Sequence, residues 1–456
     1  MRPRLLRHPL GEVYRARDLF AALHPEGDAF WLDSGPGGRA FVGSGARVVP
    51  PQGEVLATLR SELTTLRVDE PLGAVPLGLV GWFGYELRGE TVGMPVAARG
   101  PHPDAAFLRV DRLVVVEADG SAELLALGDA WEGELAEWRE RTIQVVEERR
   151  EATRLETTAD AGLEPVVSRR VPPAHSSTTS VHWHDTPARY LANIEACRDA
   201  IREGEAYQLC LTTEARVEGD FDALDVFDAV RASSATHHGG LLRIGDTTLA
   251  SASPERFLEV ASDGVVRTSP IKGTRPRGVD PADDARLRTE LVESEKERAE
   301  NLMIVDLMRN DLSRVCETGS VAVTGLLEVE SYAHVHQLVS TIEGRLRDGL
   351  GAVDAVAACF PAGSMTGAPK RRAMDLLERL EARPRGPYAG AFGYLAADGS
   401  ADLAMTIRTI VLDARGASVG TGGGITALSD PDAELAEARL KAAALLAALG
   451  AHPESA

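Results

Sequence analysis

Two segments of the chain place a pair of glutamates three residues apart on a predicted helix, a spacing that can hold a cation. In ESEKERAENLMIVDLMRNDL, Glu297 and Glu300 continue the stripe formed by Ile304 and Leu307, which indicates that both carboxylates turn inward. Buried carboxylates are costly unless a cation joins them, and oxygen ligands suit a hard ion such as Mg²⁺. A stripe that tilts into solvent is the commoner case, because glutamate is seldom buried.

The second pair repeats the spacing near the C-terminus, in SDPDAELAEARLKAAALL. Asp430 is a predicted helix cap with Pro431 after it, and Glu434, Glu437 and Lys441 follow at i, i+3 and i+7. We expect the two helices to close on one Mg²⁺, with Lys441 meeting a substrate carboxylate. A solvated Glu-Lys face is the alternative that periodicity leaves open.

Three further features are candidates for binding an anion. In GTGGGI, residues 420–425, consecutive glycines let backbone amides converge, yet neither a P-loop lysine nor a GxGxxG pattern is present. Ser364 and Thr366 supply hydroxyls in FPAGSMTGAPK, which leads into a predicted helix. Arg408 stands in the apolar strand AMTIRTIVL, where we expect it to meet a protein carboxylate or a ligand carboxylate.

Lys272 stands between a hydrophobic run and the turn-forming Gly-Thr of SPIKGTRPRG, residues 269–278. A lysine with an ordinary pKa of about 10.4 is unprotonated in roughly 0.04% of molecules at neutral pH. Covalent chemistry by this amine therefore requires burial or neighbouring cations, such as Mg²⁺ and Arg408, to lower its pKa. Glu255, in SPERF, is a candidate general acid or base in the same part of the chain.

The elements that must position these residues fall into two parts. Residues 1–155 mix short apolar runs with turns and end in a charged helix, and residues 156–184 are predicted to be a linker or surface crossing. Asp185 or Thr186 is predicted to start a helix, with Pro187 in its first turn. The strand AYQLCLTTEARV follows, and residues 241–271 are predicted to form an antiparallel meander.

Composition narrows the class of protein. The chain has 456 residues, 44% of them hydrophobic, and a formal net charge of −20, which disfavours nucleic acid or an anionic membrane as partner. We expect a cytoplasmic protein, because the N-terminus lacks an apolar signal region and no run is long enough to span a membrane. The four cysteines are widely spaced and are expected to be free buried thiols: Cys197, Cys210, Cys316 and Cys359.

Taken together, SPERF, PIKGT, EKERAENLMIVDLMRNDL, FPAGSMTGAPK, TIRT and GTGGGI with ELAEARLK resemble the chorismate-utilising enzyme family. The resemblance is strong over residues 185–450 and looser before them. It implies a four-layer α+β fold of two large antiparallel sheets flanked by helices, with residues 1–155 packed into the same body. It also implies a catalytic domain at 185–450 that binds chorismate.

The resemblance implies roles for particular residues. Glu300 and Glu437 match direct Mg²⁺ ligands, with Glu297 and Glu434 in support, and Glu255 matches the general acid or base. The implied substrate-binding residues are Arg408, Lys441, Tyr394, Ser364, Gly423, Gly424, Thr274 and Gln208.

Two positions favour one branch of the family, whose members convert chorismate and ammonia to 4-amino-4-deoxychorismate for p-aminobenzoate and folate. Lys272 is the lysine of PIKGT, where anthranilate synthases resemble PIAGT, and the resemblance implies that it adds covalently to C2 of chorismate. Gln208 stands where water-using relatives carry a lysine. The family often has histidine at the position of Gln337, so protonation roles for His336 and Gln337 stay open.

The expected source of ammonia is a separate glutamine amidotransferase subunit, because the chain has no cysteine in a glutaminase-like turn. Anthranilate synthase component I is the nearest alternative. A subunit that binds chorismate or a partner without catalysis is a further one.

Overall fold

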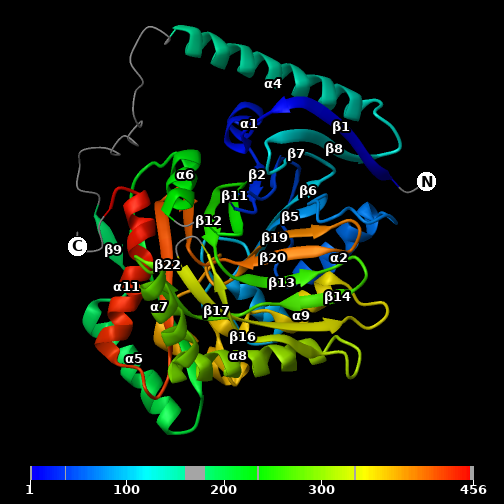
Figure 1. The fold of residues 1–456 in the computed structure, drawn as a ribbon. Helices are drawn as coiled ribbons and strands as arrows, with labels where there is room; N and C mark the ends of the chain where they lie inside the picture. The colour runs from blue at the N-terminus through cyan, green and yellow to red at the C-terminus, as the bar shows by residue number, and fades with distance from the viewer. Residues whose placement is uncertain (1–2, 36, 160–179, 234–235, 333–334, 452–456) are drawn as a thin grey trace.

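The computed structural model describes residues 3–35, 37–159, 180–233, 236–332 and 335–451. Within them, two large antiparallel sheets pack face to face, and helices cover their outer faces (Figure 1). Side chains of both sheets, among them Phe30, Leu242, Leu258 and Phe392, share one hydrophobic core. This order of helices, sheet, sheet and helices confirms the predicted α+β class.

The first sheet is 12-stranded and contains strands from both ends of the chain. In spatial order its strands are β1 (Arg4–Val13), β8 (Ser121–Gly128), β7 (Arg112–Val116), β3 (Ala40–Gly43), β2 (Ala29–Asp33), β11 (His238–Ile244), β12 (Thr247–Ser253), β21 (Thr409–Asp413), β22 (Gly416–Ile425), β10 (Gln208–Val217) and β18 (Gly367–Ala368), with β9 (Val181–Trp183) paired to β10. The predicted strand AYQLCLTTEARV is β10.

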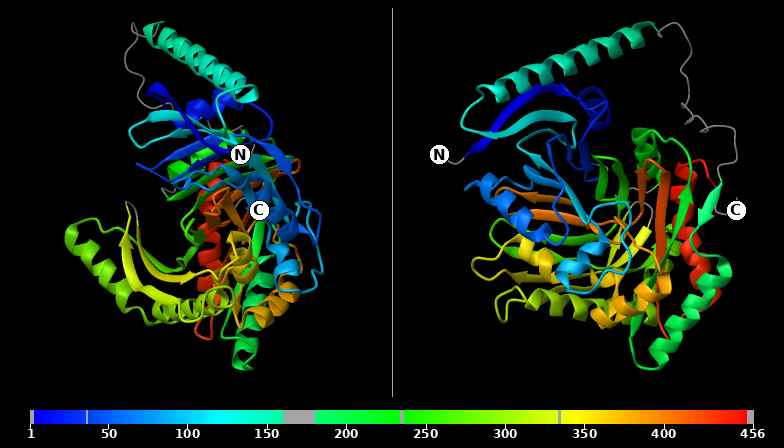
Figure 2. Two further views of the ribbon diagram at one scale, coloured as in Figure 1. Left: turned by 90° about the vertical axis from the view of Figure 1, so that its right-hand side faces the viewer. Right: turned by 180° about the vertical axis from the view of Figure 1, so that it is seen from behind.

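The second sheet is 10-stranded. Its order is β15 (Ile271–Pro276), β17 (Val335–Arg345), β14 (Val265–Thr268), β13 (Arg256–Val260), β20 (Ala401–Met405), β19 (Ala391–Ala396), β5 (Gly78–Phe83), β6 (Ala105–Val110) and β4 (Ala46–Val48), with β16 (Ala322–Ser331) paired to β17. Figure 2 shows β16 and β17 extending from the rest of the body as an arm.

The N-terminal strands are part of both sheets. β2 pairs with β11 through Trp31 and Leu241, and β5 pairs with β19 through Gly81 and Gly393. Residues 1–155 and 185–450 therefore share their sheets and their core. Of the predicted linker at 156–184, residues 160–179 lie outside the described residues, while helix α4 (Glu134–Ala159) and β9 occupy its two ends.

The predicted meander over residues 241–271 is antiparallel, but it does not stay in one sheet. β11 and β12 belong to the first sheet, and β13 and β14 belong to the second. The chain crosses between the sheets after Ser253, where Pro254 has no amide hydrogen to continue the ladder. Glu255 lies at this crossing and is buried.

The helices form the outer layers. α5 (Pro187–Arg202), α6 (Ala223–Ser233), α10 (Lys370–Glu381) and α11 (Pro431–Ala448) contact the first sheet, and α2 (Val55–Leu66), α8 (Glu295–Ser313) and α9 (Ala352–Cys359) contact the second. The remaining helices are α1 (Ala16–Leu23), α3 (Arg88–Thr91) and α7 (Pro281–Glu293). α5 begins as predicted: the Thr186 hydroxyl accepts a hydrogen bond from the Arg189 amide at 3.3 Å.

The cysteines and the helices bear on two predictions made from composition. All four cysteines are free and buried, as expected. No helix in the described ranges has both the length and the apolar character that a membrane crossing requires.

Candidate active site

Two helices carry the glutamate pairs, and a side-chain cap sets the start of each. At the start of α8, the Ser294 hydroxyl accepts a hydrogen bond from the Glu297 amide at 3.4 Å. At α11, Asp430 accepts the Ala433 amide at 2.9 Å and Pro431 follows the cap, as predicted. Because each cap orients the first turn, it also orients the glutamates that follow. We call Glu297, Glu300, Glu434 and Glu437 the carboxylate cluster.

Glu300 and Glu434 form the buried half of the cluster, at 8% and 5% exposure. Burial raises the pKa of Glu300, the Lys272 and Lys296 ammonium groups oppose this, and the Glu434 carboxylate reinforces it. The helices thus bring carboxylates more than a hundred residues apart into mutual range. The Ser429 hydroxyl donates to Glu434 Oε1 at 2.7 Å, whereas Glu300 Oε1 has no hydrogen-bond partner among the described residues.

Glu437 and Glu297 form the more exposed half. Burial disfavours ionisation of Glu437, but nearby cations, led by Lys441 at 2.7 Å, act more strongly and lower its pKa. Glu297 lies 3.7 Å from the Arg275 guanidinium. A solvated Glu-Lys face therefore describes this half of the cluster, but not the buried half.

Lys296 is a site residue that sequence reasoning overlooked. Its Nζ lies 3.3 Å from Glu434 Oε1, and its charge also favours the ionised forms of Glu300 and Glu437. Helical periodicity did not single it out, because the stripe begins at the next residue, Glu297. The available signal was the rarity of lysine in the whole chain.

The carboxylate cluster fits a hard divalent cation in its donor chemistry. It offers oxygen donors from two helices, and the unpartnered Glu300 Oε1 is a buried acceptor that a cation would satisfy. Across the part of the chain that the structure describes, no three His, Cys, Asp or Glu side chains already close on one point as a formed metal centre does. The side chains would have to close around an ion.

Glu255, at the crossing between the two sheets, lies within electrostatic range of Lys272 on β15. Burial raises the pKa of Glu255, and the Lys272 ammonium, the Ser364 hydroxyl and the Ile271 amide partly oppose that rise. Ser364 comes from the 3₁₀ turn Gly363–Met365 (η2), and its buried hydroxyl makes no hydrogen bond of good geometry with any described residue. A carboxyl, an amine and a hydroxyl from three segments therefore face one space.

Gly273 lets the strand that carries Lys272 approach helices α7 and α8. Its φ is +93°, and a Cβ at this position would lie 2.8 Å from Leu291 Cδ1 and 3.1 Å from Glu297 Oε2. Lys272 consequently lies near enough to favour the ionised forms of carboxylates on both α8 and α11. The amine and the cluster, predicted separately, lie together.

The glycines of β22 leave room for polar side chains on its neighbours. Gln208 is buried against Gly424, where an added Cβ would come within 2.2 Å of Gln208 Nε2. Gly423 faces Glu434, whose Oε2 lies 3.1 Å from the Cβ position. Gln208 Oε1 has no hydrogen-bond partner among the described residues, so it joins Glu300 Oε1 and the Ser364 hydroxyl as a buried polar atom without one.

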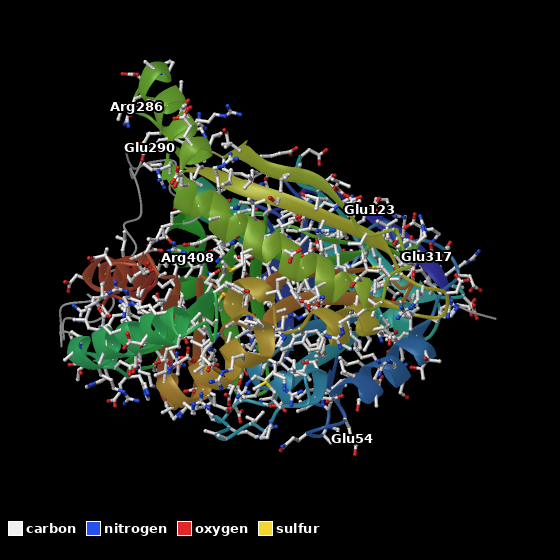
Figure 3. All side chains as sticks on the ribbon, turned by 90° about the horizontal axis from the view of Figure 1, so that it is seen from below. Glu54, Glu123, Arg286, Glu290, Glu317 and Arg408 are labelled. Atoms are coloured by element: carbon white, nitrogen blue, oxygen red, sulfur yellow. The ribbon has the colours of Figure 1, made fainter. Side chains whose placement is uncertain are left out.

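Arg408 lies between α8 and α11 in the view of Figure 3. Its Nη1 donates to the Lys441 carbonyl at 3.0 Å, and Lys441 Nζ donates to the Gly422 carbonyl at 3.0 Å. Burial lowers the pKa of Arg408, and no carboxylate lies within salt-bridge distance of it among the described residues. Of the two alternatives expected for Arg408, this favours a ligand carboxylate.

The structure does not bring Tyr394 to these residues. Tyr394 lies on β19, where the charged groups around its hydroxyl include Asp402 and Arg256. The tyrosine near Arg408 is Tyr388, whose ring packs on Gly420 so closely that an added Cβ would lie 2.1 Å away. No sequence pattern distinguishes Tyr388 from Tyr394 here, because the contact depends on packing against Gly420 of β22.

The remaining candidates lie on the arm, at the end of β17 that follows β16 and is far from β14. Thr274 is exposed on β15 and pairs with Gln337 on β17. Both ring nitrogens of His336 are engaged, at 2.8 Å from Ser331 Oγ and 3.0 Å from Asp284 Oδ1. His336 therefore ties α7 to the hairpin β16–β17. His334 lies outside the described residues.

A buried guanidinium holds the segments that carry Ser364 and Gln208. Arg385 donates to the Met365 carbonyl at 2.7 Å and to the Cys210 carbonyl at 2.9 Å. It also binds both oxygens of Glu381, at 2.7 and 2.9 Å, and stacks over the Tyr85 ring at 4.3 Å. The sequence singled out none of these residues as part of the site.

The fold and the polar groups of the site agree with a comparison against protein families. A family model described as chorismate binding enzyme matches residues 27–447, so the chain belongs to that family. The match covers the second sheet, all of the first sheet except β1, and the whole carboxylate cluster.

Two relatives are aminodeoxychorismate synthases. That of Streptomyces pristinaespiralis is 46% identical over 82% of this chain, and that of Streptomyces griseus is 39% identical over 98%. The chain spans 51% and 64% of the lengths of these two relatives. Anthranilate synthase component 1 of Streptomyces coelicolor is 37% identical over 93% of this chain and 84% of its own length.

A solved structure supports the fold. Anthranilate synthase component I from Streptococcus pneumoniae superposes with a TM-score of 0.72 at 28% identity, covering 96% of this chain and 99% of that one.

Proposed function

We propose that this protein aminates chorismate, converting chorismate and ammonia to 4-amino-4-deoxychorismate on the route to p-aminobenzoate and folate. The observation that carries the proposal is Lys272, whose amine faces Glu255 and the carboxylate cluster. The two aminodeoxychorismate synthases at 46% and 39% identity support it.

The proposed reaction proceeds in two covalent steps. The lone pair of the Lys272 amine forms a bond to C2, both ring double bonds shift by one position, and the C4 hydroxyl leaves as water with a proton from Glu255. Ammonia then bonds to C4, the double bonds shift back, and the C2–N bond to Lys272 breaks. The extra proton of the new amino group returns to Glu255, so the net change is replacement of hydroxyl by amino.

The chain's own residues would bind and orient the substrate. Arg408 is proposed to hold one carboxylate of chorismate through its guanidinium, with the neighbouring Tyr388 in support. Lys441 and the amides near Gly423 and Gly424 would face the same end of the substrate. Gln208 has a buried amide and no lysine amine, so it does not supply a base that activates water.

The carboxylate cluster is proposed to hold Mg²⁺, which when bound would neutralise and anchor the other substrate carboxylate. Glu300 and Glu437 would be direct ligands, with Glu297 and Glu434 supporting them. The unpartnered Glu300 Oε1 is the feature that supports this assignment.

We further propose that a glutamine amidotransferase supplies the ammonia as a separate subunit. The four cysteines of this chain are buried free thiols, and none lies in a glutaminase-like turn. Four free thiols fit a reducing compartment, and we propose the cytoplasm.

Incubating the purified protein with chorismate, Mg²⁺ and ammonium, and separating the products by chromatography, tests the proposal. We expect 4-amino-4-deoxychorismate without pyruvate. Anthranilate with an equivalent of pyruvate would instead establish the alternative, anthranilate synthase, which the relative at 37% identity favours. Chorismate binding without turnover, with either ammonium or an added amidotransferase and glutamine, would identify a non-catalytic subunit.

A further inference from the structure

Lysine is rare in this chain, and three of the four lysines lie near the carboxylate cluster. The sequence contains four lysines among 49 lysine and arginine residues: Lys272, Lys296, Lys370 and Lys441. Lys370 is largely buried and pairs with Asp311. The other three lie on three different elements, β15, α8 and α11, and all act on the same carboxylate cluster. A chain that uses arginine almost everywhere has lysine at this site.

Lys296 contacts the buried half of the cluster directly. Its ammonium lies 3.3 Å from Glu434 Oε1, and Glu434 is 5% exposed. It also favours the ionised form of Glu300, whose Oε1 has no hydrogen-bond partner among the described residues. The Lys296 side chain itself is 43% exposed, so its stem can swing towards solvent without disturbing the core.

An ammonium and a guanidinium would act differently in this position. A guanidinium can hold both oxygens of one carboxylate in a planar fork, which is difficult to displace. An ammonium is a compact, strongly hydrated point charge on a flexible stem, so it can neutralise a carboxylate and still give way to a competing cation.

We propose that Lys296 is the internal counter-cation of the carboxylate cluster: it occupies Glu434 while no divalent ion is bound, and gives up that carboxylate when the ion and an anionic substrate arrive. This inference rests on the proposed function, since it takes the cluster to be the divalent-cation site. Lys296 is thus a positioning residue, acting through Glu434.

The proposal predicts how the protein binds a divalent ion alone. With three lysines facing four carboxylates, the cluster carries little net charge, so Mg²⁺ without substrate should bind weakly. Lys296→Met keeps the length and apolar stem of the side chain while removing its charge. We expect this variant to bind Mg²⁺ more tightly by on the order of tenfold, from the Coulomb repulsion removed at a half-exposed site.

Isothermal titration of the full chain with MgCl₂, in the absence of chorismate, measures this affinity. The melting temperature is recorded with and without Mg²⁺ on the same samples. We expect Lys296→Met to melt lower than the unaltered protein without Mg²⁺ and to gain more from Mg²⁺. Arg298→Met is the matched control: it removes a charge from the same helix turn, but Arg298 bonds to the Val292 carbonyl, away from the cluster.

Two outcomes would overturn the proposal. One is a Mg²⁺ affinity of Lys296→Met equal to or weaker than that of the unaltered protein. The other is an equal gain in affinity in Arg298→Met, which would indicate a general charge effect. Lys296→Arg keeps the charge and should bind Mg²⁺ no more tightly than the unaltered protein. None of these readouts requires turnover, so the result is independent of which product the enzyme makes.

Discussion

The Lys272 ammonium lies within electrostatic range of the Glu255 carboxyl, and burial raises the pKa of Glu255 more than the ammonium lowers it. The carboxyl therefore keeps its proton to a higher pH than an ordinary glutamate does. A proton donor beside an amine is the arrangement needed to expel a hydroxyl while a nitrogen nucleophile adds.

Lys272→Ala should abolish formation of 4-amino-4-deoxychorismate while chorismate binding is largely kept. The amine forms the covalent bond, whereas Arg408 and the carboxylate cluster are proposed to hold the substrate. We expect turnover with ammonium to fall by at least about a hundredfold, measured by product chromatography, with chorismate binding followed by calorimetry. Lys272→Arg keeps the charge without a usable nucleophile and should be equally inactive. Full activity in either variant would disprove the covalent role.

Glu255→Gln should lower kcat by about 10²- to 10⁴-fold, as expected for loss of a general acid. In the unaltered enzyme kcat should fall as pH rises through the raised pKa of Glu255, because the acid form is then lost. That limb of the pH profile should vanish in Glu255→Gln. A residual activity with the original pH dependence would assign the limb to another group.

The raised pKa of Glu255 also predicts that the stability of the fold depends on pH. A buried carboxyl with a raised pKa binds its proton more readily in the folded state than in the unfolded state, where its pKa is about 4.3. Its cost to folding is absent below pH 4.3 or so and complete above the raised pKa. Glu255→Gln should therefore be more stable than the unaltered protein at pH 8, and this gain should disappear in acid. Thermal unfolding at both pH values measures it.

Arg408→Met should raise KM for chorismate by about 10- to 100-fold, because charge-assisted hydrogen bonds to a carboxylate contribute about 1.5–3 kcal/mol. Arg415→Met is the control, since Arg415 is exposed and pairs with Asp413 instead. Steady-state kinetics at saturating ammonium compares them. Equal KM values for Arg408→Met and Arg415→Met would remove Arg408 from the binding site.

Arg385→Met should destabilise the fold by about 3–5 kcal/mol, because it leaves the buried Glu381 carboxylate without its cation. The double variant Arg385→Met with Glu381→Met should recover part of this loss. The more exposed pair Arg379–Asp375, which has the same i,i+4 spacing within α10, is the control, and Arg379→Met should cost less than about 1 kcal/mol. Urea unfolding measures all three. Equal losses of unfolding free energy in Arg385→Met and Arg379→Met would contradict a stabilising role for the buried Arg385–Glu381 pair.

Local patterns determined the parts of this protein that depend on neighbours along the chain. The caps at Thr186 and Asp430 lie where the sequence predicts them, because a side-chain oxygen and a following proline act within one turn. The i, i+3 spacing placed both glutamate pairs on single helix faces, since that spacing is a property of the helix itself. The resemblance of ordered motifs to the chorismate-utilising family predicted the α+β fold.

Tertiary structure decided which distant residues meet. The meander divides between two sheets at Pro254, a contact pattern that strand alternation cannot reveal. Tyr388, and not Tyr394, lies near Arg408, because the Tyr388 ring packs against Gly420, which has no side chain. Lys296 belongs to the site because α8 approaches α11 and brings it to Glu434, 138 residues later in the chain. Such pairings depend on how whole elements pack in three dimensions, and no period along a single element encodes them.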